Sequence, residues 1–400
     1  MTASVSFDPG AVGPDFHDDP YPTYRRLQQE DPIHRCPDGT WFLTRYADLD
    51  RIYRDRSSFS SDKKAAFAPK FGRGTPLYEH HTTSLVFNDP PYHTRVRRAI
   101  VGALTPRVLR DMAPGVTRLI DRLLDAIAER GRFDAIADFA AAIPVEVIGN
   151  LLTVPHEERG PLRAWSLAIL GALEPTLTAE QLRRGNQAVS DFLGYLEALL
   201  ARRRREPLDE EGMLARLLRE ERATEPLTAR ELEQNCIFLL NAGHETTTNL
   251  IGNALHLLLT HPDELARLRA EPALAASCVE ECLRYESPNQ LGNRLVSAPV
   301  EIGGVRLEPG AYLHLCIGAA NRDPRTFAEP DRFDISRAPN PHLAFAAGAH
   351  ACAGMSVARL EGQIALSRIV QRFPQLRLNG NPERGRRVRF RGLAGLPLRV

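Results

Sequence analysis

The feature that most constrains the fold is one long helical segment, residues 227–262, which reads LTARELEQNCIFLLNAGHETTTNLIGNALHLLLTHP. Thr228 and Glu231 have the spacing of a capping box at a helix start, and Pro262 ends the apolar period. About 32 residues that rise 1.5 Å each predict a helix of ~48 Å, long enough to cross a whole domain. The rest of the chain must therefore pack around this helix.

Polar residues interrupt the apolar middle of the segment between Gly243 and Thr248. A glycine and three consecutive threonines are an unfavourable choice for a helix interior. We therefore expect the helix to bend or open here for a functional reason, with a polar contact between two packed helices as the alternative.

Composition indicates an ordinary globular protein. Of the 400 residues, 43% are apolar and 25% are charged, and 51 Lys and Arg balance 50 Asp and Glu to a net charge of +1. Such a balance gives no general attraction to nucleic acid or to an anionic membrane. The start of the chain lacks the layout of a signal peptide, and no apolar stretch reaches the ~20 residues that span a bilayer. We expect a soluble, cytoplasmic protein whose six scattered cysteines are reduced.

Helical periodicity dominates from about residue 90 to residue 286, whereas strand-like segments are short and lie near the two ends. These segments are 33–36, 41–46, 300–317 and 377–400. The pattern predicts a mainly α fold with small β-sheets. Residues 60–90 show no clear period, so we expect a long loop there that forms one wall of a pocket.

A glycine- and alanine-rich stretch, FAAGAHACAG at residues 345–354, holds a single cysteine. Backbone N–H groups can approach a thiolate closely in such a loop, and a flat, bulky group can lie over it. An iron porphyrin fits this description. Zinc bound by His350 and Cys352 is an alternative, although no further ligands with zinc spacing are visible, and an inert buried cysteine is another.

The stretch resembles the heme-binding signature of the cytochrome P450 family, Phe-Gly-x-Gly-x-His-x-Cys-x-Gly. The matching residues are Phe345, Gly348, His350, Cys352 and Gly354. The resemblance implies that Cys352 binds the heme iron and that the other four contact the heme. Ala346 stands where the family usually has glycine, and it adds strain if the turn needs a positive φ.

Three further motifs follow the order of the same family. Ala242, Gly243, Glu245 and Thr246 look like its small-Gly-x-acid-Thr motif, in which Glu245 and Thr246 would relay protons for O–O cleavage. The heme propionates would be bound by His93, Arg97, Arg294 and His350. Glu281, Arg284 and Arg332 would form a buried structural network behind the heme.

The resemblance covers about residues 15–400 and implies a single-domain, triangular, mainly helical fold over residues 1–400, with residues 1–15 as a flexible N-terminal segment. It implies a heme b monooxygenase that uses O2 and takes electrons from ferredoxin and ferredoxin reductase. Arg95, Arg98 and Arg359 are candidates for docking an acidic ferredoxin.

Two alternatives remain: a peroxygenase driven by H2O2, against which the Glu245–Thr246 pair argues, and a heme-binding sensor or carrier without turnover. The substrate is expected to be a hydrophobic small molecule, with no nucleic-acid or membrane partner. The expected substrate-pocket residues are Val86, Phe87, Leu239, Ala242, Gly243, Leu291, Asn293 and Leu393.

Overall fold

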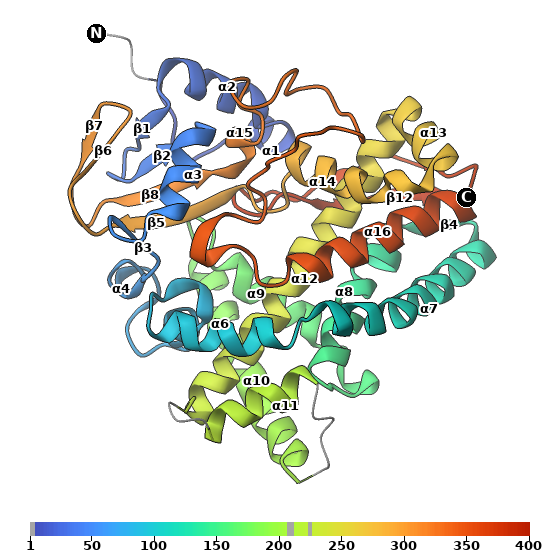
Figure 1. Cartoon of the computed structure of the whole chain (residues 1–400), viewed down its shortest axis with the longest axis horizontal. Coiled ribbons are helices and arrows are strands. Elements are labelled where there is room, and N and C mark those ends of the chain that lie inside the picture. Colours follow the sequence, from blue (N-terminus) through green and yellow to red (C-terminus); the bar gives the residue numbers. More distant parts are fainter. Residues whose placement is uncertain (1–4, 206–211, 223–225) are drawn as a thin grey trace.

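Helices form most of the molecule, as expected (Figure 1). The computed structural model describes residues 5–205, 212–222 and 226–400. The longer helices are α2 (Tyr21–Glu30), α3 (Tyr46–Arg54), α6 (Tyr92–Gly102), α7 (Pro106–Arg130), α8 (Ala142–Leu151), α9 (Leu162–Gly171), α10 (Ala179–Arg203), α12 (Ala229–Thr260), α13 (Pro262–Ala270), α14 (Ala275–Tyr285) and α16 (Met355–Arg372). The shorter helices are α1 (Pro14–Asp18), α4 (Lys64–Phe71), α5 (Pro76–Thr83), α11 (Met213–Arg219) and α15 (Ile317–Ala320).

The long central helix, α12, has the predicted bounds and passes through the middle of the molecule (Figure 1). Its capping box is formed, because Thr228 accepts from the backbone of Glu231 and the Glu231 carboxylate accepts from the backbone of Thr228. The helix continues without a break across residues 243–248. The hydroxyls of Thr246 and Thr248 donate to the carbonyls four residues earlier, at 2.8 and 3.0 Å, so each hydroxyl has a partner within the helix.

The largest sheet has five strands in the order β1-β2-β8-β5-β3. The strands of the molecule are β1 (Ile33–Arg35), β2 (Trp41–Leu43), β3 (Phe59–Ser60), β4 (Arg132–Asp134), β5 (Leu291–Val296), β6 (Val300–Ile302), β7 (Val305–Leu307), β8 (Tyr312–Cys316), β9 (Arg377–Leu378), β10 (Glu383–Arg384), β11 (Leu393–Gly395) and β12 (Pro397–Arg399). Strand β2 pairs parallel to β8, which pairs antiparallel to β5 with Asn293 opposite His314. Because side chains alternate along β5, Arg294 and Asn293 leave the sheet on opposite faces.

The long loop expected over residues 60–90 is wrong in part, because α4 and α5 lie within it and a 3-10 turn follows at Leu85–Phe87. Thr75 caps α5 by accepting from the backbone of Tyr78, and Pro76 occupies the first helical position. These signals specify one short helix that hydrophobic periodicity does not reveal. The segment does form a wall of the cavity described below.

The flexible segment expected over residues 1–15 is also wrong for its described part. Val5 and Phe7 are buried, and the ring of Phe7 packs edge-on against Phe42 with centroids 4.9 Å apart. Residues 1–4 lie outside the described residues. Across the described part of the chain, none of the helices combines the length and the apolar character that crossing a membrane requires.

Candidate active site

The cysteine loop connects the 3-10 turn Gly348–His350 to the start of α16. The backbone N–H of Cys352 donates to the carbonyl of Phe345 at 2.9 Å, which closes the loop. Gly348 has φ +69°, and a Cβ there would lie 2.3 Å from the backbone oxygen of Tyr53, so only glycine fits. Ala346 has φ +55°, so the one departure from the family signature does fall at a left-handed position.

Two opposing influences set the charge of the Cys352 thiol. Burial raises its pKa, while the backbone N–H of Gly354 and the guanidinium groups of Arg97 and Arg359 favour the thiolate. Helix α16 begins three residues later and directs its N-terminal dipole toward the same region. A bound metal ion removes the proton from a coordinating thiol, so this environment suits a metal ligand.

Two cavities meet at Cys352. One has a volume of about 120 Å³ and the other of about 240 Å³. Both are lined by Cys352, His350, Thr246 and Ala242, so the cysteine loop and the middle of α12 face each other across them. The slot between these two elements is where the family resemblance requires the heme.

The four residues expected to bind the heme propionates gather at this slot without an anion to match them. Arg97 and His93 line one cavity, Arg294 lines the other, and His350 lines both. In the described part of the chain, no carboxylate lies within ion-pairing distance of either guanidinium. The nearest carboxylate to His350 is Asp89, whose oxygen lies 3.9 Å from Nε2. Buried cations without a counter-ion are costly, so the set fits a dicarboxylate such as heme b.

His93 and His350 also lie in surroundings with an excess of positive charge. Their rings stack with centroids 3.9 Å apart, and Nε2 of His93 is buried without a partner. Burial, together with the neighbouring arginines, lowers the pKa of His93 to about 4 and that of His350 to about 2. Across the described residues, no three His, Cys, Asp or Glu side chains come together as a zinc site needs.

The two residues expected to relay protons face different surroundings. The Thr246 hydroxyl lies at the slot, where it donates to the carbonyl of Ala242. The Glu245 carboxylate is buried and lines neither cavity, and it forms an ion pair with Arg387. The Glu–Thr pair therefore spans the helix from the slot to the segment between β10 and β11.

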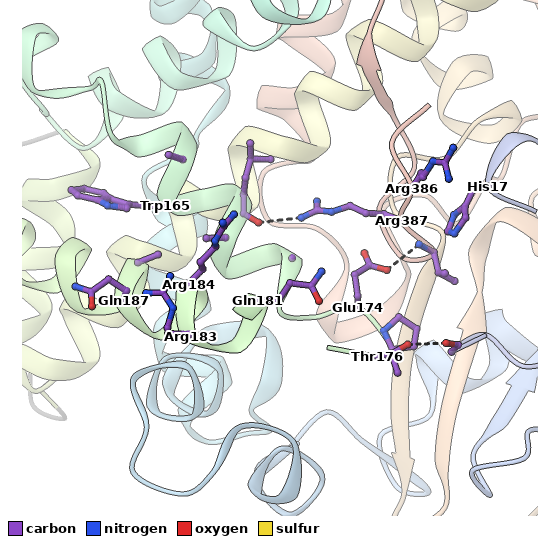
Figure 2. A pocket seen from close by; sticks show the side chains of 18 of the residues that line it. His17, Trp165, Glu174, Thr176, Gln181, Arg183, Arg184, Gln187, Arg386 and Arg387 are labelled. Carbon is purple, nitrogen blue, oxygen red and sulfur yellow. Dashed lines mark hydrogen bonds between the residues drawn. The ribbon is translucent and has the colours of Figure 1, made fainter. Parts of the chain in front are cut away.

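Arg387 belongs to a larger cavity of about 750 Å³ that does not reach Cys352. Figure 2 shows Arg387 reaching from the C-terminal segment toward α9, where it donates to the carbonyl of Leu167 at 3.1 Å. Glu174, Gln181 and Arg184 line the same cavity (Figure 2). Arg387 thus touches both Glu245 and a cavity near the surface.

The buried network behind the cysteine loop differs from the expectation at one residue. Glu281 and Arg284 form a fully buried bidentate pair with two 2.8 Å contacts. The second guanidinium on Glu281 belongs to Arg337, at 3.2 Å, and not to Arg332. Arg332 contributes its backbone carbonyl to Arg284, while its exposed side chain pairs with Glu329. The expected role of the Arg332 side chain is therefore wrong.

Most of the expected pocket residues do line the two cavities. These are Val86, Phe87, Leu239, Ala242, Gly243 and Asn293. Leu291 and Leu393 do not, because Leu291 packs in the cluster around the N-terminal segment and Leu393 packs in the core around α7 and α16. The sequence analysis missed other lining residues, including Leu170, Phe238, Asn241, Arg389 and Phe390. Helical spacing from Ala242 could have found Phe238, whereas nothing in the sequence singles out Arg389.

Comparisons with known proteins agree with this geometry. The Cytochrome P450 family model matches residues 167–384. The chain is 36% identical over 398 residues to the "Biotin biosynthesis cytochrome P450" of Bacillus subtilis (strain 168), covering 96% of this chain and 97% of the relative. It is 37% identical over 408 residues to the "Cytochrome P450 monooxygenase PikC" of Streptomyces venezuelae, covering 98% and 94%.

A solved structure of similar shape is that of P450BioI in complex with an acyl carrier protein ligated with hexadec-9Z-enoic acid. It matches with a TM-score of 0.91 at 35% identity, covering 97% of this chain and 100% of that one. The likeness thus extends over the whole fold and includes the cysteine loop and the central helix. The chain belongs to the cytochrome P450 family.

Proposed function

We propose that this cytochrome P450 monooxygenase oxidises a hydrophobic small molecule with electrons from a separate ferredoxin-type donor. Its cofactor is heme b and its co-substrate is O2. When bound, heme b would supply the activation of O2 that, with two electrons from the donor and two protons, lets one oxygen atom enter the substrate while the other leaves as water. The proposal is carried by one observation: Cys352, the unmatched cations and Thr246 all face the same slot.

In this proposal the protein would hold the heme through its iron and through its propionate groups. Cys352 binds the iron as a thiolate, and Phe345, Gly348 and Gly354 shape the loop beneath it. Arg97 and Arg294, with His93 and His350, bind the propionates by charge-assisted hydrogen bonds. Glu281 and Arg284 hold the segment that leads to the loop, because both are fully buried and paired.

Proton delivery in this proposal runs along α12. The Thr246 hydroxyl holds a proton at the slot, donated to the Ala242 carbonyl until O2 is bound. Glu245 holds a carboxylate on the far side of the helix beside Arg387, whose guanidinium also lines the large cavity. If the Glu245 carboxylate accepts a proton from that cavity, rotation of its side chain away from Arg387 would bring the proton toward Thr246.

The electron donor would dock near the cysteine loop. Arg98 is exposed on α6, whereas Arg95 pairs with Glu231 and Arg359 pairs with Glu280. We expect Arg98→Glu to slow reduction by an acidic ferredoxin several-fold and to do so more at low salt. Arg306→Glu, on the distant strand β7, is the control. Unchanged reduction kinetics after reversal of Arg95, Arg98 and Arg359 together would overturn this docking site.

Two experiments test the function. The first is the difference spectrum of the reduced protein with and without carbon monoxide, in which a strongly red-shifted Soret band marks thiolate-bound heme. The second compares product formation with ferredoxin, ferredoxin reductase and NADPH against product formation with H2O2 alone. Product with H2O2 only would mean a peroxygenase. Stable heme binding with no product in either assay, across hydrophobic substrates, would favour a sensor or carrier.

A further inference from the structure

Arg389 is a buried cation in the wall of the 240 Å³ cavity. It is 8% exposed, and it lies between the buried residues Val388 and Phe390 in the segment that joins β10 to β11. Its guanidinium contacts neutral groups only. Nη1 donates to the carbonyl of Leu173 at 3.4 Å. With the Asn293 amide oriented so that all of its atoms find partners, its Oδ1 accepts from Nη2 at 2.8 Å and from Nη1 at 3.3 Å. Within the described part of the chain, no carboxylate forms an ion pair with it.

The carboxylate of Glu174 contacts the backbone of this segment. Its Oε2 accepts from the backbone N–H groups of Val388 and Arg389, at 2.9 and 3.0 Å. Glu174 therefore holds the backbone of the segment in place and leaves the Arg389 guanidinium without a counter-ion. Burying a guanidinium in this way is costly unless a further partner arrives.

Other arginines in and next to this segment do have carboxylate partners, unlike Arg389. Arg387 pairs with Glu245, and Arg391 and Arg384 both pair with Glu286. The protein thus supplies a carboxylate to the neighbouring arginines and none to the one that lines the cavity. An anion from outside the chain would complete the pattern.

The surroundings of Arg389 are short of negative charge and of hydrogen-bond partners. Burial and the charge of Arg389 lower the pKa of Lys70 to about 8, and burial together with the charges of His80, Lys70 and Arg389 lowers the pKa of His81. Asn241 on α12 is 1% exposed, lines the same cavity, and has no partner for either side-chain amide atom. Apolar side chains, including Phe87, Leu170 and Phe390, form much of the remaining wall.

We propose that the substrate is an apolar molecule that carries an anionic group, a carboxylate foremost, and that Arg389 binds this group. The apolar remainder lies against Phe87, Leu170 and Phe390, and Asn241 offers a second polar contact. This inference rests on the proposed function, because it names the substrate class of the same pocket. A guanidinium held by Asn293 and Leu173 is pre-oriented, so it would bind a carboxylate in a fixed, charge-assisted geometry.

The test measures binding to the ferric holoenzyme, by the shift of the Soret band and by equilibrium dialysis. The probes are dodecanoic acid and 4-phenylbutanoic acid, each with its methyl ester and its N-acetylcysteamine thioester, and dodecyl phosphate. We expect at least one acid to bind about tenfold or more tightly than its ester. Tighter binding of dodecyl phosphate than of dodecanoic acid would assign the anion as a phosphate.

Three variants separate anion binding from a structural role. Arg389→Gln should weaken binding of the acid about 10- to 100-fold and of the ester less than threefold, and Arg389→Lys should recover part of the loss. Arg386→Gln removes the same charge from an exposed position in the same segment and should leave both affinities within twofold. If Arg389 had only a structural role, Arg389→Gln would weaken the binding of acid and ester equally.

Several outcomes would overturn the inference. One is a ratio of acid affinity to ester affinity that Arg389→Gln leaves unchanged. Another is a thioester that binds as tightly as the acid and whose affinity Arg389→Gln does not change. A third is that none of the acids binds better than its ester. The carbon monoxide spectrum of each variant reports the heme separately. If the unsubstituted enzyme showed no red-shifted Soret band with carbon monoxide, the proposed monooxygenase activity would be contradicted. Equilibrium dialysis would still report whether Arg389 binds the acid.

Discussion

Ala346 holds a left-handed backbone conformation, with φ +55°, in the turn that leads to Cys352. This conformation costs an L-residue roughly 1–2 kcal/mol, whereas the greater freedom of glycine in the unfolded chain costs about 0.4–1 kcal/mol. We therefore expect Ala346→Gly to raise the free energy of unfolding by roughly 0.5–1 kcal/mol, measured by urea denaturation of the holoenzyme. Ala351→Gly is the control, because Ala351 has φ −53°. A destabilised Ala346→Gly variant would show that the Ala346 methyl group contributes more than the strain it imposes.

Thr246 is distinguished from its neighbours by the space that its side chain faces. Thr246 and Thr248 make the same back-bond within α12, but of the two only Thr246 lines the slot. We expect Thr246→Ala to keep heme and substrate binding while at least half of the NADPH consumed ends as hydrogen peroxide. The measurement is product and peroxide formed per NADPH, with Thr248→Ala as the control. Unchanged coupling in Thr246→Ala would contradict its role in proton delivery.

At the scale of elements, the Glu281 network joins α14 to the segment before the cysteine loop. Glu281 accepts from Arg284, Arg337, the backbone of Asp334 and Asn340. Removing one partner of a buried ion pair costs about 3–5 kcal/mol, because the remaining charge stays buried. Chemical denaturation should show this loss for Glu281→Gln. Arg332→Ala should change stability by less than about 0.5 kcal/mol, since its side chain is exposed, and an equal loss there would contradict the network.

Helix α16 carries a buried carboxyl group, Glu361, that has no partner for Oε2 and lies in the wall of the slot. Burial raises its pKa to about 8. Between the unfolded pKa near 4.5 and this value, the unfolded chain releases a proton that the folded chain keeps, so stability falls as the pH rises. The loss is on the order of 3 kcal/mol at pH 7. Glu361→Gln should flatten stability between pH 5 and pH 8, measured by denaturant titrations of the holoenzyme. A slope equal to that of the unsubstituted enzyme would mean that Glu361 is paired or hydrated.

The sequence predicts an element well where the signal is local to it. The capping box of α12 lies within four residues, and the structure has both of its hydrogen bonds. The sequence suggests Arg332 as a partner of Glu281, whereas the structure has Arg337 there. Which of the two guanidinium groups points inward depends on the path of the turn between them, and no local pattern specifies that path. Leu291 shares a face of β5 with Asn293, yet it lies at the start of the strand and packs against side chains of the N-terminal segment instead of lining the pocket. Such choices depend on packing between distant parts of the chain.

At the scale of the whole molecule, the site joins segments from most of the chain. Glu245 pairs with Arg387, Asn293 accepts from Arg389, and His93 stacks on His350. The family motifs identified the cysteine loop and the cationic groups, because their spacing within the chain is characteristic. The contacts of Arg387 and Arg389 could not be predicted, because each joins residues about 100 positions or more apart in the chain that no local pattern links.

We propose that this interleaving makes residues 1–400 a single folding unit. The expected result is one cooperative transition in urea, in which far-UV circular dichroism, tryptophan fluorescence and heme absorbance change with the same midpoint. The physical reason is that the slot is built from residues between His93 and Arg389, so no part of the chain can complete it alone. Two separated midpoints for the helical signal and the heme absorbance would contradict a single unit. The apoprotein is the control for the contribution of heme binding to the midpoint.

The segment 387–391 carries arginines at every second position. Arg387 pairs with Glu245, Arg389 lines the 240 Å³ cavity, and Arg391 pairs with Glu286. Val388 and Phe390 between them are buried in apolar clusters. Inserting or deleting one residue here would exchange the arginines with the apolar residues between them. Guanidinium groups would then lie in apolar packing, and apolar side chains would lie beside Glu245, Glu286 and the cavity. The length of this segment should therefore tolerate less change than its composition.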